Sequence, residues 1–374
     1  MRRTCLLCLI VLSWLNSLQA QPIELRGVWL TNVDSEVFDD QARIAEAMRF
    51  LSEYHFNAVF PVVWNDAKTV FPSALMDSLF GLRINPRYEG RDPLAELIAA
   101  AEKYDIAVIP WFEYGFAAAH EKQGGLLIQR KPHWAERDHA GNLLKKNGFE
   151  WLNPFHPEVQ QFVMDLVREV VRNYEVAGVQ GDDRLPALPI EGGYSDFTQR
   201  LFAAEHGGQM PPYDFRETQW QRWRADKLND FTRRFYQEVK AVKPECVVSW
   251  APSIYPWSYD EYLQDWPGWI QAGCADLIIP QAYRYNLRTY RQVISALTPS
   301  NLKITDGRVF PGVLLNLGNY IISEKLLLAM LKEHRQVGYA GEVFFFYEGL
   351  RKDDDRLAKA LVKSYYGEKA RRPF

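Results

Sequence analysis

Acidic residues end three of the short apolar runs that the sequence favours as β-strands: Glu113, the pair Asp182 and Asp183, and Glu348. In a parallel barrel, charged residues at the carboxyl ends of strands face the cleft where substrates bind. Cleavage of a glycosidic bond needs one carboxylic acid to protonate the leaving oxygen and one carboxylate to attack or to activate water. These four residues are therefore the candidate catalytic groups, with Asp183 preferred as the reacting or charge-stabilising carboxylate.

Side-chain alternation sends Asp182 and Asp183 to opposite faces of their strand, so only one of them is expected to point straight into the barrel. Arg184 follows directly and is a partner for the other. The alternative for each carboxylate is a structural ion pair or a helix cap. Three acidic strand ends from non-adjacent units are harder to explain in that way, which favours a functional cluster.

Amides and aromatic rings on other strands are candidates for holding a sugar. Gln281 and Tyr283 stand two residues apart, so they share one face of a strand and can meet hydroxyl groups or an N-acetyl carbonyl. Ring faces stack on the C–H surfaces of sugars, and the chain has 12 Trp, 19 Tyr and 21 Phe. Further candidates for substrate binding are Trp29, Asn32, Trp64, Trp111, Asn153 and Trp250. An aromatic-rich core is the competing interpretation.

The elements that would position these residues alternate regularly along the chain. Eight short apolar runs are predicted as strands: 25–32, 58–64, 107–113, 178–183, 247–253, 277–283, 309–316 and 342–348. Helical patterns lie between them, at 40–54, 93–104, 157–174, 215–242, 259–272, 323–337 and 353–366. This order predicts an α/β protein, a single (β/α)8 TIM barrel with long loops after strands 2, 3 and 4.

Composition and motifs exclude several classes. The net charge is −3, with 44 Lys+Arg against 47 Asp+Glu, so nothing favours nucleic acid or an acidic membrane surface. The 7 histidines include no pair at a spacing such as H-E-x-x-H, so neither a metal site nor a cofactor is expected. Signatures of acyl, phosphoryl and hydride transfer are missing from the sequence as well.

The first 20 residues have the pattern of a secretory signal peptide, with Arg2 and Arg3, an apolar run and a small residue at Ala20. Cleavage there leaves no stable membrane anchor and predicts export to the periplasm or the extracellular space, although an uncleaved anchor is the alternative. The barrel is expected over 22–367, followed by a frayed basic tail at 368–374. Cys246 and Cys274 are equally compatible with a disulfide and with two buried thiols.

Several stretches together resemble the glycosyl-hydrolase-like family 10 domain, a family of exported bacterial (β/α)8 barrels. They are 24–32, 56–64, the Pro110–Glu113 strand with Trp111, the Trp151–Pro154 segment with Asn153, 178–183 and 280–283. The resemblance implies hydrolysis of a glycan, plausibly of the cell wall, without a cofactor. It places Glu113, Asp182, Asp183 and Tyr283 in the cleft. Arg184 departs from the tyrosine that relatives commonly carry there.

Two functions remain open at this point, both for a protein expected to be a monomer with a glycan partner. The first is a glycoside hydrolase in which Asp183 works with Glu113 or Glu348, including a substrate-assisted variant that uses Asp182, Asp183 and Tyr283. The second is a non-catalytic carbohydrate-binding barrel, in which aromatic stacking supplies the affinity.

Overall fold

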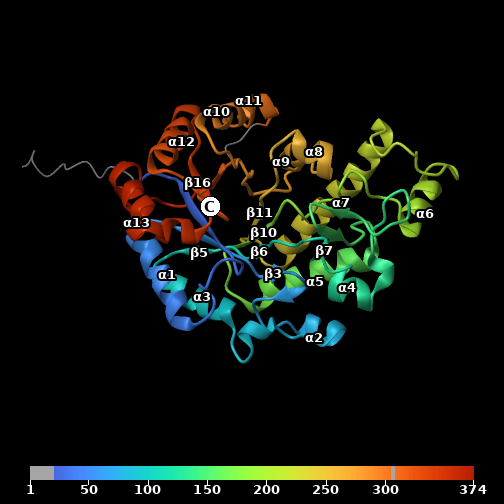
Figure 1. Ribbon diagram of the computed structural model, residues 1–374, viewed down its shortest axis with the longest axis horizontal. Helices are drawn as coiled ribbons and strands as arrows, with labels where there is room; N and C mark the ends of the chain where they lie inside the picture. The colour runs from blue at the N-terminus through green and yellow to red at the C-terminus, as the bar shows by residue number, and fades with distance from the viewer. Residues whose placement is uncertain (1–20, 305–307) are drawn as a thin grey trace, which may run out of the picture.

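The computed structural model describes residues 21–304 and 308–374, so the predicted signal peptide lies outside the described residues. Parallel strands alternate with helices along the chain, as predicted for the α/β class. In Figure 1, one side of the strands is surrounded by α1 (Gln41–Glu53), α3 (Pro93–Glu102), α10 (Leu287–Ala296), α12 (Glu324–Val337) and α13 (Tyr347–Ser364). The other side carries α4 (Gly125–Arg130), α6 (Asp196–Glu205) and the start of α7 (Thr218–Val242).

All eight predicted strand positions contain a strand, although most strands are shorter than predicted. One sheet has the order β13-β16-β1-β2-β5 and a second has the order β12-β11-β10-β6. Their bounds are β1 (Leu25–Leu30), β2 (Ala58–Pro61), β5 (Ala107–Val108), β6 (Trp111–Phe112), β10 (Gly178–Gly181), β11 (Val247–Trp250), β12 (Leu277–Ile278), β13 (Gly312–Leu314) and β16 (Gly341–Phe345). Parallel bridges from Val62 to Trp111 and from Gln281 to Gly312 continue the pairing between the two sheets.

Helices occupy the predicted positions between the strands. They are α1 (Gln41–Glu53), α3 (Pro93–Glu102), α5 (Pro157–Asn173), α7 (Thr218–Val242), α8 (Trp257–Tyr262), α9 (Trp266–Gln271), α12 (Glu324–Val337) and α13 (Tyr347–Ser364). The predicted 259–272 helix is two helices, because Leu263 has a left-handed φ of 59° that ends α8. Pro267 then stands in the first turn of α9, where its missing N–H costs nothing.

The connections contain elements that the sequence patterns did not reveal. They include α2 (Ala74–Phe80), α4 (Gly125–Arg130), α6 (Asp196–Glu205), α10 (Leu287–Ala296) and α11 (Pro299–Leu302). Short strands form the hairpins β3 (Trp64–Asn65) with β4 (Lys68–Thr69) and β14 (Asn316–Leu317) with β15 (Tyr320–Ile321). A three-stranded antiparallel sheet is built from β7 (Ala117–His120), β8 (Lys145–Lys146) and β9 (Phe149–Trp151).

The predicted frayed tail is wrong. Arg371 forms a parallel bridge with Ile23, and its backbone nitrogen donates to the carbonyl of Pro22 at 2.8 Å. Arg26 donates to the carbonyl of Glu368 at 2.5 Å. The chain end consequently lies against β1 (the C mark in Figure 1), because backbone pairing there compensates for the cost of ordering it.

Cys246 and Cys274 are both buried free thiols, which decides between the two alternatives that the sequence left open. Burial raises the pKa of the Cys246 thiol to about 11, so it stays protonated and unreactive near neutral pH. Within residues 21–304 and 308–374, no helix combines the length and the apolar content of a membrane span.

Candidate active site

The register of two neighbouring strands brings the candidate carboxylates together. β10 pairs in parallel with β6, so that Gly181 lies opposite Phe112. The next residues along the two strands are Asp182 and Glu113, which therefore leave the sheet side by side at its carboxyl edge. A Cβ atom at Gly181 would meet the ring of Trp250 and the carbonyl of Leu185 at 2.5 Å, so only glycine lets the chain turn there into the acidic pair.

Arg184 joins the three carboxylates, and we call Glu113, Asp182, Asp183 and Arg184 the carboxylate cluster. Its Nη2 lies 2.7 Å from Asp182 Oδ2 and 3.3 Å from Glu113 Oε1. Its Nη1 lies 3.0 Å from Asp183 Oδ1, in an ion pair that lacks hydrogen-bond geometry. The planar guanidinium can contact several carboxylates at once, which a lysine ammonium does less well. The guanidinium also lies 4.5 Å from the ring centroid of Phe149.

Burial and mutual repulsion shift the acids of the cluster toward their neutral forms. Asp182 is almost fully buried, and burial, followed by repulsion from Asp183, raises its pKa well above the usual range despite the opposing charge of Arg184. Burial also raises the pKa of Glu113, against the lowering effects of Arg184 and of Asn65. Asn65 Nδ2 donates to Glu113 Oε2 at 2.5 Å. A carboxyl group with a raised pKa can hold a proton at neutral pH, as a general acid must.

Gln281 and Tyr283 both lie at this cluster, as the shared strand face predicted. Gln281 Nε2 donates to Asp182 Oδ1 at 2.8 Å and to the carbonyl of Ala251 at 3.1 Å. Burial, and then the charge of Asp182, raises the pKa of Tyr283 well above its usual value, so the phenol stays a neutral donor. The ring of Tyr283 packs against that of Phe345 at 5.4 Å.

Glu348 is the predicted catalytic residue that the structure does not bring into the cluster. It lies in the first turn of α13 and accepts a hydrogen bond from Ser35 Oγ. Its pocket is lined by the β1–α1 connection, Arg87 and Arg351. Burial raises the pKa of Glu348 to about 7, and the neighbouring charges that act on it are Arg351 and Glu36. Glu113, rather than Glu348, is therefore the partner that the geometry offers to Asp183.

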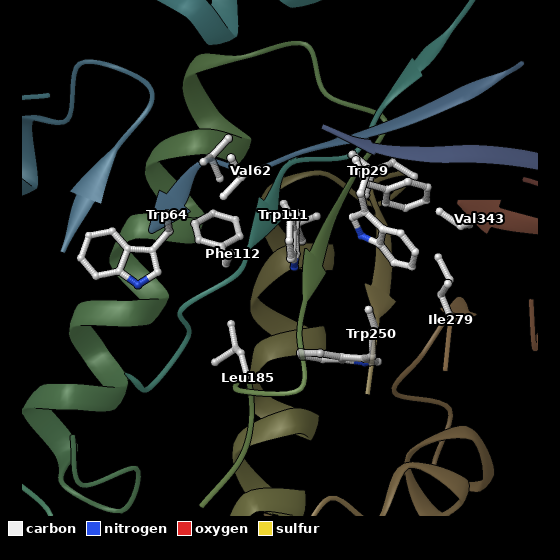
Figure 2. Packing of buried hydrophobic residues seen from close by; sticks show 14 of the residues in the cluster. Trp29, Val62, Trp64, Trp111, Phe112, Leu185, Trp250, Ile279 and Val343 are labelled. Carbon is white, nitrogen blue, oxygen red and sulfur yellow. The ribbon is translucent and has the colours of Figure 1, made fainter. Parts of the chain in front are cut away.

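Most tryptophans proposed as sugar platforms are core residues, which corrects that expectation. Trp29 and Trp64 are 1% exposed and Trp250 is 0% exposed, so no ring face is open to a ligand. Figure 2 shows Trp29, Trp111 and Trp250 pointing inward among the strands. Trp29 Nε1 donates to Gln180 Oε1 at 2.7 Å, and Trp250 Nε1 donates to the carbonyl of Cys274 at 3.0 Å. The indoles of Trp29 and Trp250 are therefore packing elements. Trp64 is equally buried, but its Nε1 has no hydrogen-bond partner among the described residues.

Asn153 and Trp111 are corrected because both are buried, although Nε1 of Trp111 has no hydrogen-bond partner among the described residues. Asn32 stays a prediction. Asn153 is 0% exposed and its Nδ2 donates to Ser195 Oγ at 2.8 Å, so it fixes the start of α6 instead of a ligand. Trp111 is 3% exposed and lies edge-on to Phe345 at 6.4 Å, beneath the ring that contacts Tyr283. Asn32 is half-buried in the β1–α1 connection.

Other aromatic residues are exposed in the connections that follow β11 and β12. Tyr285 is 59% exposed, stands two residues after Tyr283 and meets the ring of Tyr320 edge-on at 4.7 Å. Trp257 is 44% exposed and contacts the ring of Tyr262 at 5.4 Å. Gln264, two residues after Tyr262, donates through Nε2 to the carbonyl of Asp182 at 3.1 Å, so this segment lies beside the cluster. The sequence signal for these residues was their position in loops at the carboxyl ends of strands.

Solved structures of glycoside hydrolases share the fold of this chain. The glycoside hydrolase domain of PgaB (BpsB) from Bordetella bronchiseptica has a TM-score of 0.67 at 14% identity, covering 91% of this chain and 98% of that one. The α-L-fucosidase isoenzyme 2 from Paenibacillus thiaminolyticus has a TM-score of 0.65 at 18% identity, covering 92% of this chain and 49% of that one. At these identities, the likeness shows a common fold.

Sequence comparison shows the family to which the chain belongs. The model of the Glycosyl hydrolase-like 10 family matches residues 24–317, and the chain belongs to this family. It is 24% identical over 292 residues to glycosyl hydrolase YngK of Bacillus subtilis, covering 70% of this chain and 54% of YngK. It is 24% identical over 300 residues to glycosyl hydrolase DigH of Escherichia coli K12, covering 69% of this chain and 65% of DigH. The chain thus spans between half and two thirds of these relatives.

Proposed function

We propose that the protein is a glycoside hydrolase that acts on a polysaccharide of the bacterial envelope. Support comes from one observation above all: Glu113, Asp182 and Asp183 converge on a single guanidinium at the carboxyl edge of β6 and β10. In this proposal the parallel strands close into a (β/α)8 barrel, whose carboxyl face carries the active site in enzymes of that architecture. Membership of a hydrolase-like family supports the same reaction class.

Glu113 is assigned as the general acid. Burial raises its pKa, and its side chain is 17% exposed, so it can keep a proton and still reach a glycosidic oxygen. Asp183 is 25% exposed, the most accessible of the three acids. It stabilises the positive charge that develops at the anomeric carbon, and it either bonds to that carbon or activates the attacking water.

Asp182, Gln281 and Tyr283 form the positioning side of the site. The Asp182 carboxyl group is held by Gln281 Nε2, and Tyr283 supplies a neutral phenol nearby. Such a set also suits the substrate-assisted variant, in which these groups would orient an N-acetyl oxygen toward the anomeric carbon. The exposed rings of Trp257 and Tyr285 are proposed to stack on sugar units beyond the bond that is cleaved.

The cellular setting is part of the proposal. The predicted signal peptide supports export to the periplasm or the extracellular space, where an envelope glycan is accessible. We propose a monomer that uses no cofactor and whose partner is the glycan itself. The near-neutral charge balance supports the view that neither nucleic acid nor an acidic membrane surface is a target.

A non-catalytic carbohydrate-binding barrel is the second candidate, and Arg184 is the observation that favours it. The guanidinium gives every carboxylate of the cluster an ionic partner. An acid and a nucleophile that are both neutralised in this way could serve only to hold sugar hydroxyl groups. In that case, Asp183→Asn would leave glycan affinity nearly unchanged, because stacking on exposed rings would dominate binding.

The test is an incubation with peptidoglycan, peptide-free wall glycan and a panel of soluble polysaccharides, with released ends read by mass spectrometry. The wild type is compared with Asp183→Asn and Glu113→Gln, and Glu348→Gln is the matched carboxylate control outside the cluster. The hydrolase proposal predicts release by the wild type and by Glu348→Gln but not by the two cluster variants. Equal binding of one glycan by every protein without any release would favour the binding barrel.

A further inference from the structure

Two histidines and one glutamate gather away from the carboxylate cluster, beside the start of α5. His133 lies in the 3-10 turn Pro132–Trp134, His156 is the N-cap of α5, and Glu158 is in the first turn of that helix. One ligand atom from each residue lies within 4.8 Å of the other two. Their side chains are exposed or half-buried, so small rotations can bring the atoms closer without moving the backbone.

The proposed ligands contact one another, and a neighbouring indole holds one of them as an outer-shell group of a metal site would. His133 Nε2 lies 3.1 Å from Glu158 Oε2, and the two imidazole rings are 5.4 Å apart. Trp134 Nε1 donates to the same Oε2 atom at 3.0 Å, which orients the carboxylate. Outer hydrogen bonds of this kind fix the ligands of bound metals and support their affinity.

The donor types indicate which ion would fit. Calcium and magnesium prefer oxygen ligands, whereas two imidazole nitrogens and one carboxylate oxygen suit Zn²⁺ and leave a position for water. The surroundings carry positive charge, because Lys131 Nζ lies 5.7 Å from the ring centroid of Trp134 and the N-terminus of α5 carries a partial positive charge. Binding would therefore depend on the ligand bonds themselves.

We propose that His133, His156 and Glu158 bind one Zn²⁺ ion that fastens both ends of segment 134–155. This segment carries Phe149, whose ring lies against Arg184, and Asn147, whose Nδ2 donates to Tyr262 Oη at 2.9 Å. The ion would thus stabilise the loop that packs on the carboxylate cluster while taking no part in the reaction. The sequence pattern did not single out this group, because His133 is distant in sequence from the other two ligands.

The experiment titrates chelator-treated, tag-free protein with Zn²⁺ by calorimetry and with Co²⁺ by visible absorption. His133→Ala and Glu158→Gln each remove one ligand, and His139→Ala removes an exposed histidine of the same loop as the matched control. Far-UV circular dichroism checks that each variant is folded. The proposal predicts one Zn²⁺ per chain, at least tenfold weaker binding in both ligand variants, and wild-type binding in His139→Ala.

Thermal unfolding supplies a second readout. Zn²⁺ should raise the melting temperature of the wild type and of His139→Ala, and should raise it less in His133→Ala, since an ion that binds only the folded state stabilises that state. Absence of stoichiometric uptake by the wild type would overturn the proposal, as would equal affinity in all four proteins. Weakened binding in His133→Ala with full binding in Glu158→Gln would overturn the three-ligand assignment.

Discussion

Replacing Arg184 with alanine would leave three carboxylates without the cation that they share. The side chain is 13% exposed and contacts Glu113, Asp182 and Asp183 at 2.7 to 3.3 Å. Removing one partner of a buried ion pair costs about 3–5 kcal/mol, since the charge left behind is neither solvated nor paired. Because three acids are affected, Arg184→Ala is expected to lower the free energy of unfolding at pH 8 by an amount at the upper end of this range.

The loss of stability in Arg184→Ala should become smaller as the pH falls. Asp182 and Glu113 already have raised pKa values in the folded protein, and removal of Arg184 takes away the charge that lowers them. An acid whose folded pKa is raised binds protons more readily in the folded state than in the unfolded state, so its destabilising effect grows as the pH rises through that pKa. Protonation at pH 5 relieves part of the repulsion, and the variant should recover stability relative to the wild type.

Urea unfolding followed by tryptophan fluorescence at pH 5 and pH 8 measures both effects. Arg49→Ala is the control, because that arginine forms ion pairs with Glu46 and Glu53 at an exposed position and should leave the midpoint close to that of the wild type. A loss below about 1 kcal/mol at pH 8 would refute the view that Arg184 holds the cluster together. An equal loss at both pH values would refute the electrostatic explanation.

Three further predictions concern the other buried groups and the exposed rings. Glu342→Gln should lower the free energy of unfolding by about 3 kcal/mol, because a buried carboxylate loses its charge beside Arg335 and His334. Burial opposes ionisation of Glu342, but Arg335 and His334 lower its pKa. The wild type should therefore lose the stability that ionised Glu342 contributes as the pH falls below the usual pKa range of glutamate. If the stability of Glu342→Gln fell with pH in the same way as that of the wild type, this explanation would be contradicted. Trp250→Phe should reduce stability without changing glycan affinity, whereas Tyr285→Ala should weaken glycan affinity several-fold at unchanged stability. Melting and binding assays on both variants measure these effects. The reverse pattern would contradict the assignment of Trp250 to the core and of Tyr285 to sugar stacking. Activity should fall as the pH rises through the raised pKa of Glu113, and a pH–rate profile without that alkaline limb would exclude Glu113 as the acid.

The strand positions could be predicted because apolar runs between helical patterns carry a strong periodic signal. The lengths of the strands could not be predicted, because a strand continues only where its backbone N–H groups can donate to a neighbouring strand. Pro110 interrupts the predicted third strand between β5 and β6, and Pro280 follows the short β12. Proline has no N–H to donate, so regular pairing stops at each of them. The hairpins and the β7–β8–β9 sheet were missed because two to four residues give too little pattern to detect.

The acids of the site were predictable for a topological reason. Parallel strands in register deliver the residues that follow them to one edge, which is how Glu113 and Asp182 meet. Glu348 follows a strand as well, but it belongs to the first turn of α13 and accepts from Ser35 instead. The direction of a side chain beyond the last strand residue depends on the local turn, and the sequence pattern does not contain it.

The tryptophans were the least predictable part. An indole at a strand position either faces the interior or borders the cleft, and composition favours neither. Trp29 and Trp250 are enclosed by the core, whereas Trp257, at the start of α8, and Tyr285, in the connection after β12, are exposed. The sequence marks Arg184 as a departure from relatives, but only the structure shows that one guanidinium contacts all three acids.

Hydrolysis in H₂¹⁸O, with the products read by mass spectrometry, tests the central claim most directly. A glycosidase adds one water to each bond that it cleaves, so every new reducing end should gain a single ¹⁸O with the wild type and no new ends should form with Asp183→Asn. That outcome is the one predicted by the carboxylate cluster. If the wild type binds an envelope glycan and forms no labelled end, the claim that this cluster cleaves glycosidic bonds is contradicted.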